Sequence, residues 1–424
     1  MSVANFAEAP WPCRRLKFCA TYNDETLSDN TDDFKLIEYV EISDVSIVEG
    51  IRSSTPMLFH EAPSRARRKV RAGDVLVSTV RTYLKAIVAL TEAPENLIAS
   101  TGFCVIRPTE DLHAGYAGWV AKSEEFVGEV VSRSVGVSYP AINASELLDI
   151  KVPLPPLEIQ KRIAAFLDEK TARIDALIAK KRALLERLAE KRQAIITQAV
   201  TKGLNPAAPM KDSGIHWLGA IPAHWQVKRL KYVSPRVTVG IVVTPAAYYT
   251  DEGVLALRGL NVRTMGFDLS DTRNITRDGH ELNRKSELRE DDLVAVRTGA
   301  PGTTAIVTGE LAGCNCVDLV IIRKPAEAAP RYLGWFLNSD VAKTQYSLGS
   351  EGALQQHFNV ETSKEVSLTL PPLKEQHEIA AYIDTALAAH DRQSGMVETS
   401  VSRLQEYRAA IITAAVTGRI EGLQ

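Results

Sequence analysis

The residues most able to do chemistry in this chain form a basic run, SRARRKVR (Ser64–Arg71), which Arg81 and Lys85 follow at the end of a predicted strand. Guanidinium and ammonium groups at this density are suited to phosphate contact, and one or two arginines could read guanine edges. A solubilising loop is the simpler interpretation, and the run taken alone favours it. The preceding segment, Asp24–Asp33, is acidic, so the basic run stands out against its surroundings.

Catalytic signatures are missing. An Asn- or Asp-Pro-Pro-aromatic motif, which an adenine methyltransferase would need, does not occur, nor do HExxH, GxSxG or a GxGxxG after a strand. The eight histidines lack metal-ligand spacing. Asp168, Glu169 and Lys170 are nuclease-like in type, but consecutive residues of a helix point in different directions. The sequence therefore predicts no catalytic site, metal site or cofactor on this chain.

One long stretch occurs twice in the sequence. The two copies are the elements that must position the basic residues. Leu154–Thr201 begins LPPLEIQKRIAAFLDE, and Leu370–Thr417 begins LPPLKEQHEIAAYIDT. They align without a gap at an offset of 216 residues (370 − 154), with 22 identical positions. Pro-Pro favours a helix start, and no proline interrupts either stretch afterwards. Each stretch is predicted to be one helix of roughly 65–70 Å at about 1.5 Å per residue.

Both helices show an apolar spacing with heptad character, which predicts that they pack antiparallel on each other as a coiled coil. The second helix keeps the phase of the first, and its predicted seam includes Ala386, His390, Gln393 and Tyr407. Residues 153–204 hold 11 Lys and Arg against 6 Asp and Glu, which indicates a solvated face or an acidic partner. The predicted seam of the first helix is Ile163, Leu167, Lys170, Ile174, Leu177, Lys181, Leu184, Leu188, Lys191 and Ile195.

The length of 424 residues and 45% apolar composition predict two or three globular domains. No apolar run is long enough for a membrane span, and the first residues lack the features of a signal peptide, so we expect a cytoplasmic protein. Five cysteines without a CxxC pair argue against disulfides and zinc. We expect them to be reduced packing residues.

The segments outside the helices are also duplicated, although more weakly. WPCRRLKF (Trp11–Phe18) matches WQVKRLKY (Trp225–Tyr232), and YAGWVAKS (Tyr116–Ser123) matches YLGWFLNS (Tyr332–Ser339). Short β-branched runs and a helical piece around Tyr116–Val131 predict mixed α/β (α+β) domains. We therefore divide the chain into residues 1–152 (first domain), 153–204 (first helix), 205–368 (second domain, with a linker at 203–215) and 369–424 (second helix).

The two domains differ most in their loops. STVRTYLKA (Ser78–Ala86) corresponds to AVRTGAPGTTA (Ala295–Ala305), which is longer and rich in glycine. This turn lacks the order of a P-loop and is most simply a hairpin. Two related domains with unlike loops indicate two related tasks with unlike targets.

With LPPLxxQ twice in front of a long helix, the linker Ser213–Val233, and RTGAPG followed by CVDLVIIRKP (Cys316–Pro325), the chain resembles the DNA-specificity (S) subunits of type I restriction–modification systems over nearly its whole length. The first copy has Ile159-Gln160 where the second has the family's Glu-Gln pair, Glu375-Gln376. We expect this departure to alter only a contact at the helix start.

The resemblance implies two target-recognition domains that each read half of a split, asymmetric DNA sequence, held apart by the coiled coil. It implies double-stranded DNA, two modification subunits and motor-nuclease restriction subunits as partners. S-adenosylmethionine, ATP and Mg²⁺ are expected on those partners only, so this chain is not itself an enzyme. A single-chain restriction–modification enzyme would need several hundred more residues. A coiled-coil adaptor without DNA specificity stays open, although it would not need two divergent domains.

Residue type and position at loops or strand ends select the candidates for DNA contact. Most of them are expected to touch phosphates. The candidates are Arg65, Arg67, Arg68, Lys69, Arg81 and Lys85 in the first half and Arg258, Arg263 and Arg297 in the second.

Overall fold

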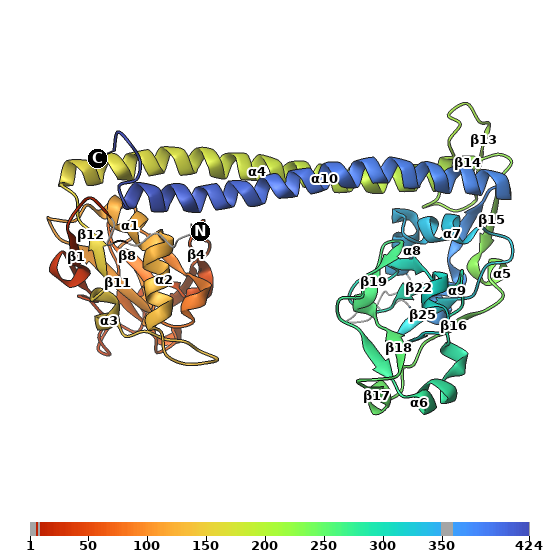
Figure 1. Ribbon diagram of the computed structural model, residues 1–424, viewed down its shortest axis with the longest axis horizontal. Helices are drawn as coiled ribbons and strands as arrows, with labels where there is room; N and C mark the ends of the chain where they lie inside the picture. The colour runs from red at the N-terminus through yellow and green to blue at the C-terminus, as the bar shows by residue number, and fades with distance from the viewer. Residues whose placement is uncertain (1–5, 7–8, 349–358, 424) are drawn as a thin grey trace. The chain divides into compact units, whose positions relative to one another are not determined.

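The computed structural model of the chain describes residues 6, 9–348 and 359–423 (Figure 1). The chain forms two compact units, one of Met1–Arg182 with Glu398–Gln424 (unit 1) and one of Ala183–Val397 (unit 2). Both divisions fall inside the long helices α4 (Leu157–Lys202) and α10 (Leu373–Val416). Each unit therefore contains a globular part and one segment of each long helix. The domain limits drawn from the sequence stay a prediction.

Unit 1 contains two four-stranded sheets. The first is antiparallel in the order β2-β11-β8-β9, and the second has the order β6-β3-β10-β7 with β3 and β10 parallel. The strands are β2 (Ala20–Tyr22), β3 (Leu36–Val40), β6 (Thr55–Leu58), β7 (Ala66–Lys69), β8 (Val75–Ser78), β9 (Ile87–Ala89), β10 (Leu97–Ser100) and β11 (Phe103–Pro108).

The predicted strands around β8, β9 and β11 are confirmed, and burial explains the composition of β8. Val75 and Val77 belong to the core beside the helices, whereas Leu76 belongs to the core between the two sheets. A strand covered on both faces is apolar at every position and does not alternate. Unit 1 is thus layered as helices, first sheet and second sheet.

Unit 2 repeats this arrangement. Its antiparallel sheet has the order β16-β25-β22-β23, and in its second sheet β18 and β24 are parallel, as β3 and β10 are in unit 1. The strands are β16 (Val237–Val239), β17 (Tyr249–Thr250), β18 (Val254–Leu257), β21 (Arg273–Ile275), β22 (Leu293–Val296), β23 (Thr304–Ile306), β24 (Asn315–Cys316) and β25 (Leu319–Ile322). The glycine-rich segment between β22 and β23 is a hairpin, as predicted.

The second sheets differ at their edges. In unit 1 the edge strand beside β10 is β7, which carries the basic run, whereas in unit 2 the second sheet ends at β24. Unit 2 instead adds β17 at the opposite edge, beside β21. The sheets nearest the long helices share a topology, and the outer sheets have diverged.

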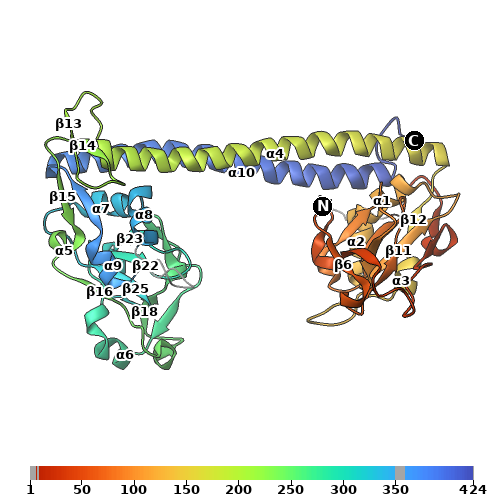
Figure 2. The same ribbon diagram turned by 180° about the vertical axis from the view of Figure 1, so that it is seen from behind.

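Short helices lie between each first sheet and the long helices, as both views show (Figures 1 and 2). They are α1 (Ala114–Lys122) and α2 (Glu124–Arg133) in unit 1 and α7 (Pro330–Leu337) and α8 (Asp340–Leu348) in unit 2. The helical piece predicted around Tyr116–Val131 is confirmed, and it consists of two helices that are separated by Ser123. The Ser123 side chain caps the start of α2 by accepting from the backbone N–H of Phe126.

Short paired strands and four short helices make up the remaining strands and α-helices of the described residues. They are β1 (Cys13–Arg15) paired with β12 (Lys151–Pro153), β15 (Gln226–Arg229) with β26 (Ser367–Leu370), β13 (Met210–Asp212) with β14 (Ala220–Pro222), β4 (Val45–Ser46) with β5 (Gly50–Ile51), β19 (Val262–Arg263) with β20 (Gly266–Phe267), and α3 (Ala144–Leu148), α5 (Leu230–Val233), α6 (Arg277–Leu282) and α9 (Val360–Glu365).

The long helices pack antiparallel within each unit, which confirms the predicted pairing. In unit 1 the beginning of α4 shares a core with the end of α10, and Arg408 donates to Asp175 at 2.8 Å. In unit 2 the end of α4 shares a core with the beginning of α10, and Arg192 donates to Asp391 at 3.3 Å. The two ion pairs occupy equivalent positions of the sequence repeat.

The predicted seam of α4 is correct at Ile163, Leu167, Ile174 and Leu188 and wrong at several other positions. Ile174 and Leu188 are buried as predicted, but Leu177 is 43% and Leu184 is 45% exposed, and Thr171 and Ile178 are buried instead. The same shift occurs in α10, where Leu387 and Arg408 replace Ala386 and Tyr407, whereas His390 is buried as predicted. Steps of three and four can be taken in either order from one starting residue, and only packing against the partner helix decides between them.

Every helix in residues 6, 9–348 and 359–423 lacks the long apolar stretch that spanning a bilayer requires.

Candidate nucleic-acid interface

A buried glutamine fastens each domain to the start of its long helix. Gln160 Oε1 accepts from the backbone N–H of His113 at 2.7 Å, and its Nε2 donates to the carbonyls of Asp111 and Pro155 at 3.0 and 2.8 Å. Gln376 repeats these bonds. It accepts from Ala329 N at 2.7 Å and donates to the carbonyls of Pro371 and Glu327 at 2.9 and 3.4 Å. The glutamine of the LPPLxxQ motif is therefore a structural clamp, a role that the sequence motif alone did not reveal.

A buried tyrosine links each domain to the end of the other long helix. Tyr116 Oη lies 3.0 Å from the carbonyl oxygen of Pro153 and 3.5 Å from that of Val416, near the end of α10. Tyr332 Oη lies 3.1 Å from the carbonyl of Thr369 and 3.3 Å from that of Val200, near the end of α4. Burial raises the pKa of both phenols, so each stays protonated and able to donate.

A tryptophan–aspartate bond completes the clamp. Trp119 Nε1 donates to Asp168 at 2.9 Å in unit 1, and Trp335 Nε1 donates to Asp384 at 2.9 Å in unit 2. The other two residues of the nuclease-like trio point elsewhere: Glu169 pairs with Arg173, and Lys170 lies over the Phe166 ring. The three residues do not converge, as their helical spacing predicted.

The departure at the helix start changes one contact, as expected. Glu375 Oε2 and His224 Nε2 lie 2.8 Å apart and form a hydrogen bond. Its counterpart, Ile159, packs against the core of unit 1. Both glutamine clamps are unaffected by this difference.

Most of the basic run in unit 1 lies in a strand and is already engaged. Arg65 pairs with Glu41 at 3.2 Å, and Arg67 lies over the Phe59 ring and 3.5 Å from Asp29. Arg68 is half-buried in β7, and its Nε has no hydrogen-bond partner in the structure. Lys69 is half-buried beside it. Within the described residues, Lys69 has no acidic partner.

Arg81 and Lys85 occupy a different place, in the loop after β8. Both side chains are exposed, and both backbones are left-handed, with φ of 50° and 53°. Arg81 stacks on the ring of Tyr139 with its guanidinium carbon 4.8 Å from the ring centre. The structure thus separates the candidates of the first half into a strand group and a loop pair.

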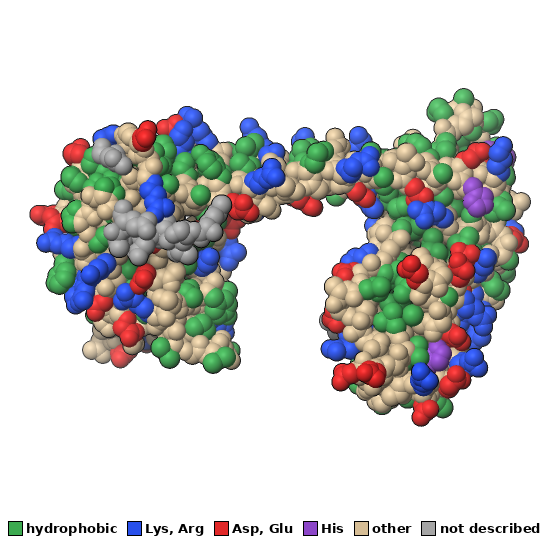
Figure 3. Space-filling view, in the orientation of Figure 1, with side chains coloured by type: hydrophobic (Ala, Val, Ile, Leu, Met, Phe, Trp, Pro, Cys, Tyr) green, Lys and Arg blue, Asp and Glu red, His purple; other side chains and the backbone are tan. Residues whose placement is uncertain are grey.

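The candidates of the second half are all ion-paired inside their own unit. Arg258 donates to Asp271 at 2.9 Å, Arg263 donates to Asp268 at 2.8 Å, and Arg297 pairs with Asp318. Positive and negative side chains are also interspersed on the face of the molecule in Figure 3. The Arg263–Asp268 pair is exposed on both sides and holds its arginine only weakly, whereas the side chains of Arg258 and Arg297 are mostly buried.

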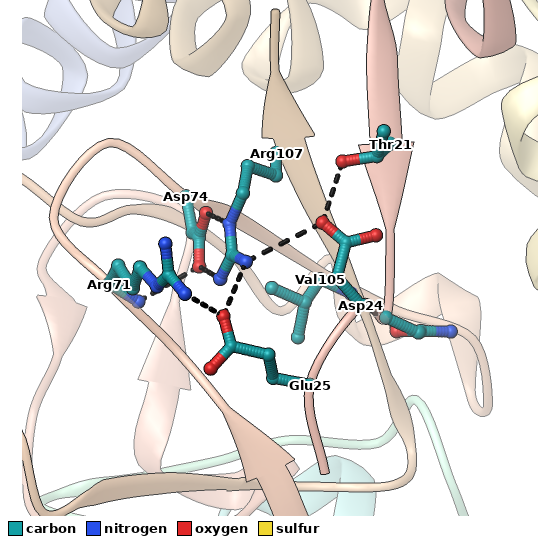
Figure 4. Close-up of polar contacts among 8 residues, drawn as sticks. Thr21, Asp24, Glu25, Arg71, Asp74, Val105 and Arg107 are labelled. Carbon is teal, nitrogen blue, oxygen red and sulfur yellow. Dashed lines mark hydrogen bonds and ion pairs between the residues drawn. The ribbon is translucent and has the colours of Figure 1, made fainter.

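A buried ion-pair cluster fixes the basic strand of unit 1 (Figure 4). Asp74 is 1% exposed and accepts two bonds from Arg107, from Nε and Nη2, both at 2.8 Å. Arg107 also donates to Glu25 at 3.0 Å, and Arg71 pairs with the same carboxylate. These acidic contacts raise the pKa of Arg107, so its charge is permanent.

Glu25 begins the segment that pairs with β7. The Lys69 N–H donates to the carbonyl of Glu25 at 3.1 Å, and the Leu27 N–H donates to that of Arg67 at 2.8 Å. Unit 2 keeps only the central pair: Arg323 donates to Asp292 at 2.5 Å, and its other bonds go to the carbonyls of Glu287 and Lys285. The extra acidic residues therefore accompany β7, and the described part of unit 2 shows no such contacts to Arg323 beyond Asp292.

Burial disfavours the thiolate form of the cysteines. All five cysteines are free, and burial raises their pKa, to about 11 for Cys19 and about 12 for Cys104. Raised values keep these thiols protonated and unreactive. Across the described part of the chain, no three His, Cys, Asp or Glu side chains gather as metal ligands do.

Comparison with known proteins agrees with this architecture. A family model described as the type I restriction modification DNA specificity domain matches residues 69–187. The specificity subunit of the Escherichia coli EcoBI type I restriction enzyme is 25% identical over 308 residues, 70% of this chain and 64% of that subunit. The EcoKI specificity subunit of E. coli strain K12 is 26% identical over 326 residues, 75% of this chain and 68% of that subunit.

Solved structures share the fold. A chain from work on complex assembly and conformational transition of the type I R–M system aligns with a TM-score of 0.76 and 22% identity, covering 97% of this chain and 99% of that one. The HsdS subunit from Thermoanaerobacter tengcongensis aligns with a TM-score of 0.50 and 23% identity, covering 97% of each chain. The chain is thus similar to the DNA specificity subunits of type I restriction–modification systems, and these matches favour that class over an adaptor without DNA specificity.

Proposed function

We propose that this chain gives a type I restriction–modification complex its DNA specificity, with each globular domain reading one half of a split, asymmetric target. The observation that carries the proposal is the duplicated clamp: Gln160, Tyr116 and Trp119 in unit 1 correspond to Gln376, Tyr332 and Trp335 in unit 2. The clamps are alike while the outer sheets differ. Two domains that read different half-sites need the same attachment to the helices but different DNA-facing surfaces, and the clamps and outer sheets have this combination.

The helix pair would set the unread gap between the half-sites and provide two similar surfaces for two modification subunits. Double-stranded DNA and restriction subunits complete the proposed partners. S-adenosylmethionine, ATP and Mg²⁺ would bind those subunits, and the chain itself would carry out no reaction. We infer that loss of the closing segment of α4, KRQAIITQAV, weakens assembly more than it weakens either domain.

The proposed DNA contacts remain Arg65, Arg67, Arg68, Lys69, Arg81, Lys85, Arg258, Arg263 and Arg297. Their environments support a division of roles. The half-buried strand residues suit contact with phosphates, because their positive charge attracts the DNA backbone whatever its sequence. The ion-paired arginines of unit 2 would exchange a carboxylate for a phosphate or a base.

The decisive experiment purifies the chain alone and with a modification subunit, measures DNA binding, and sequences the methylated adenines in a host that expresses the system. A split, asymmetric motif supports the proposal. Replacing residues 1–152 with another recognition domain should change one half-site only, and a heptad-compatible insertion in the helices should change only the gap. A continuous palindrome would contradict the two-domain reading, and sequence-independent assembly without DNA binding would support the adaptor.

A further inference from the structure

Two loops of unit 1 form a single surface feature, which we call the Tyr139 loop cluster. It consists of Val80–Lys85, after β8, and Ser134–Ile142, between α2 and α3. The Arg81 N–H donates to the carbonyl of Pro140 at 2.8 Å, and the Ile142 N–H donates to that of Thr79 at 2.9 Å. The hydroxyls of Thr82 and Ser134 are 2.8 Å apart. The two loops are therefore fastened together at several points.

The second loop is closed at its base. Val135 and Ala141 exchange backbone hydrogen bonds of 2.8 and 3.0 Å. Gly136 has φ +116°, and a Cβ there would lie 3.0 Å from the Tyr139 carbonyl oxygen, so this turn requires glycine. The tip of the loop is thus a short, defined hairpin.

This cluster presents apolar side chains to solvent. Val137 is fully exposed, Val135 is 79% exposed and Tyr139 is 66% exposed. Tyr83 and Leu84, in the first loop, are half exposed. Single exposed apolar residues are ordinary, but a contiguous group on a fixed loop marks an interaction surface.

The same surface carries two cations that have no acidic partner within the described residues, Arg81 and Lys85. Arg65 and Arg67 in the basic run are paired with carboxylates, and so is Arg297, which occupies the place of Arg81 in the repeat. Arg81 instead stacks on the Tyr139 ring, and this contact orients the guanidinium without engaging its N–H donors. The donors of its planar fork remain free for a ligand.

We propose that the Tyr139 loop cluster enters a DNA groove and reads bases, with Arg81 recognising a guanine edge and Val137 contacting an adjacent thymine methyl. The inference rests on the proposed function and deepens it. A bidentate arginine–guanine contact needs a correctly oriented fork, and apolar side chains contact the thymine methyl group in the major groove. The unpaired cations favour DNA over a protein partner, because a polyanion supplies the negative charge that the cluster lacks.

The test uses the full chain with its modification subunit and selects bound duplexes from a randomised pool. Arg81→Lys keeps the charge but removes the fork. It should lower the preference for guanine at one position by about 5- to 150-fold while the affinity for random DNA and the salt slope stay unchanged. Tyr139→Leu should weaken the same preference, and Tyr139→Phe should retain it because the ring remains. Val137→Ala should reduce a neighbouring thymine preference.

Arg133→Lys is the matched control, since Arg133 is an exposed arginine of the same unit that is paired with Glu129 at 2.8 Å. It should leave the selected sequence unchanged. An Arg81→Lys variant that selects the parent sequence overturns the inference and makes Arg81 a phosphate contact. Reduced assembly with the modification subunit in the Val137 and Tyr139 variants, with unchanged sequence preference, also overturns it and identifies a protein-docking surface. A parent complex without any sequence preference instead refutes the proposed function.

Discussion

Replacing Gln160 with leucine tests the clamp most directly. The side chain is fully buried and makes three hydrogen bonds of 2.7, 2.8 and 3.0 Å, so the substitution leaves one N–H and two carbonyls without partners. An unsatisfied buried polar group costs about 1–3 kcal/mol. Partial access of water reduces the total, and we expect the free energy of unfolding of unit 1 to fall by about 2–5 kcal/mol.

Hydrogen exchange is the suitable assay, because a chain with two compact units need not unfold in one step. Protection should fall in α1 and β12, and protection in unit 2 should be unchanged. Gln376→Leu should mirror this in unit 2 with a slightly smaller effect, because its bond to Glu327 is longer, at 3.4 Å.

Gln198→Leu is the control, since Gln198 is exposed on the same helix. It should change the free energy by less than about 0.5 kcal/mol. A loss below about 1 kcal/mol for Gln160→Leu, or a loss shared equally by both units, would refute the clamp.

Three further substitutions test other parts of the structure. Asp74→Asn removes the charge that faces Arg107, and urea unfolding should show unit 1 destabilised by about 2–3 kcal/mol. This is the low end for a broken buried pair, because Arg107 keeps its bond to Glu25. An unchanged urea midpoint would contradict the role of this pair. Burial lowers the pKa of Lys122 from 10.5 to about 8. Between these pH values the folded state binds fewer protons than the unfolded state, so the free energy of unfolding should rise from pH 8 to 10.5. Lys122→Met should flatten that rise, whereas Lys180→Met, at an exposed site, should not. Lys69→Gln should weaken binding to all DNA sequences and lower the salt slope by about one, and equal slopes in variant and parent would exclude a phosphate contact.

The long helices could be predicted because their signal is local and duplicated. Two prolines, an uninterrupted helical composition and an offset of 216 residues give their beginnings and their equivalence. The seam was predicted only in part. Steps of three and four residues from Ile163 place Leu177 and Leu184 inside, but the partner helix covers Thr171 and Ile178 instead. Composition along one helix does not say which of two neighbouring stripes the other helix covers.

The candidate contacts show the same limit. Residue type identified Arg81 and Arg297 as equivalent arginines, and their sequence neighbourhoods, VRT in both cases, are identical. Their surroundings differ because Tyr139 and Asp318, which are remote in sequence, reach them only in the folded chain. Tertiary structure therefore decides that the guanidinium group of Arg81 is free and that of Arg297 is ion-paired.

The sequence by itself determined the repeat, the two helices, the absence of known catalytic motifs and the kind of residue that could contact DNA, because each of these depends on composition and spacing along the chain. Tertiary structure decided the rest. It made Gln160 and Tyr116 clamps, placed the basic run in a strand held by the Asp74–Arg107 pair, and set the Tyr139 loop beside Arg81. These roles depend on which distant backbone groups and side chains come within hydrogen-bonding distance, and that is fixed only when the sheets pack on the helices.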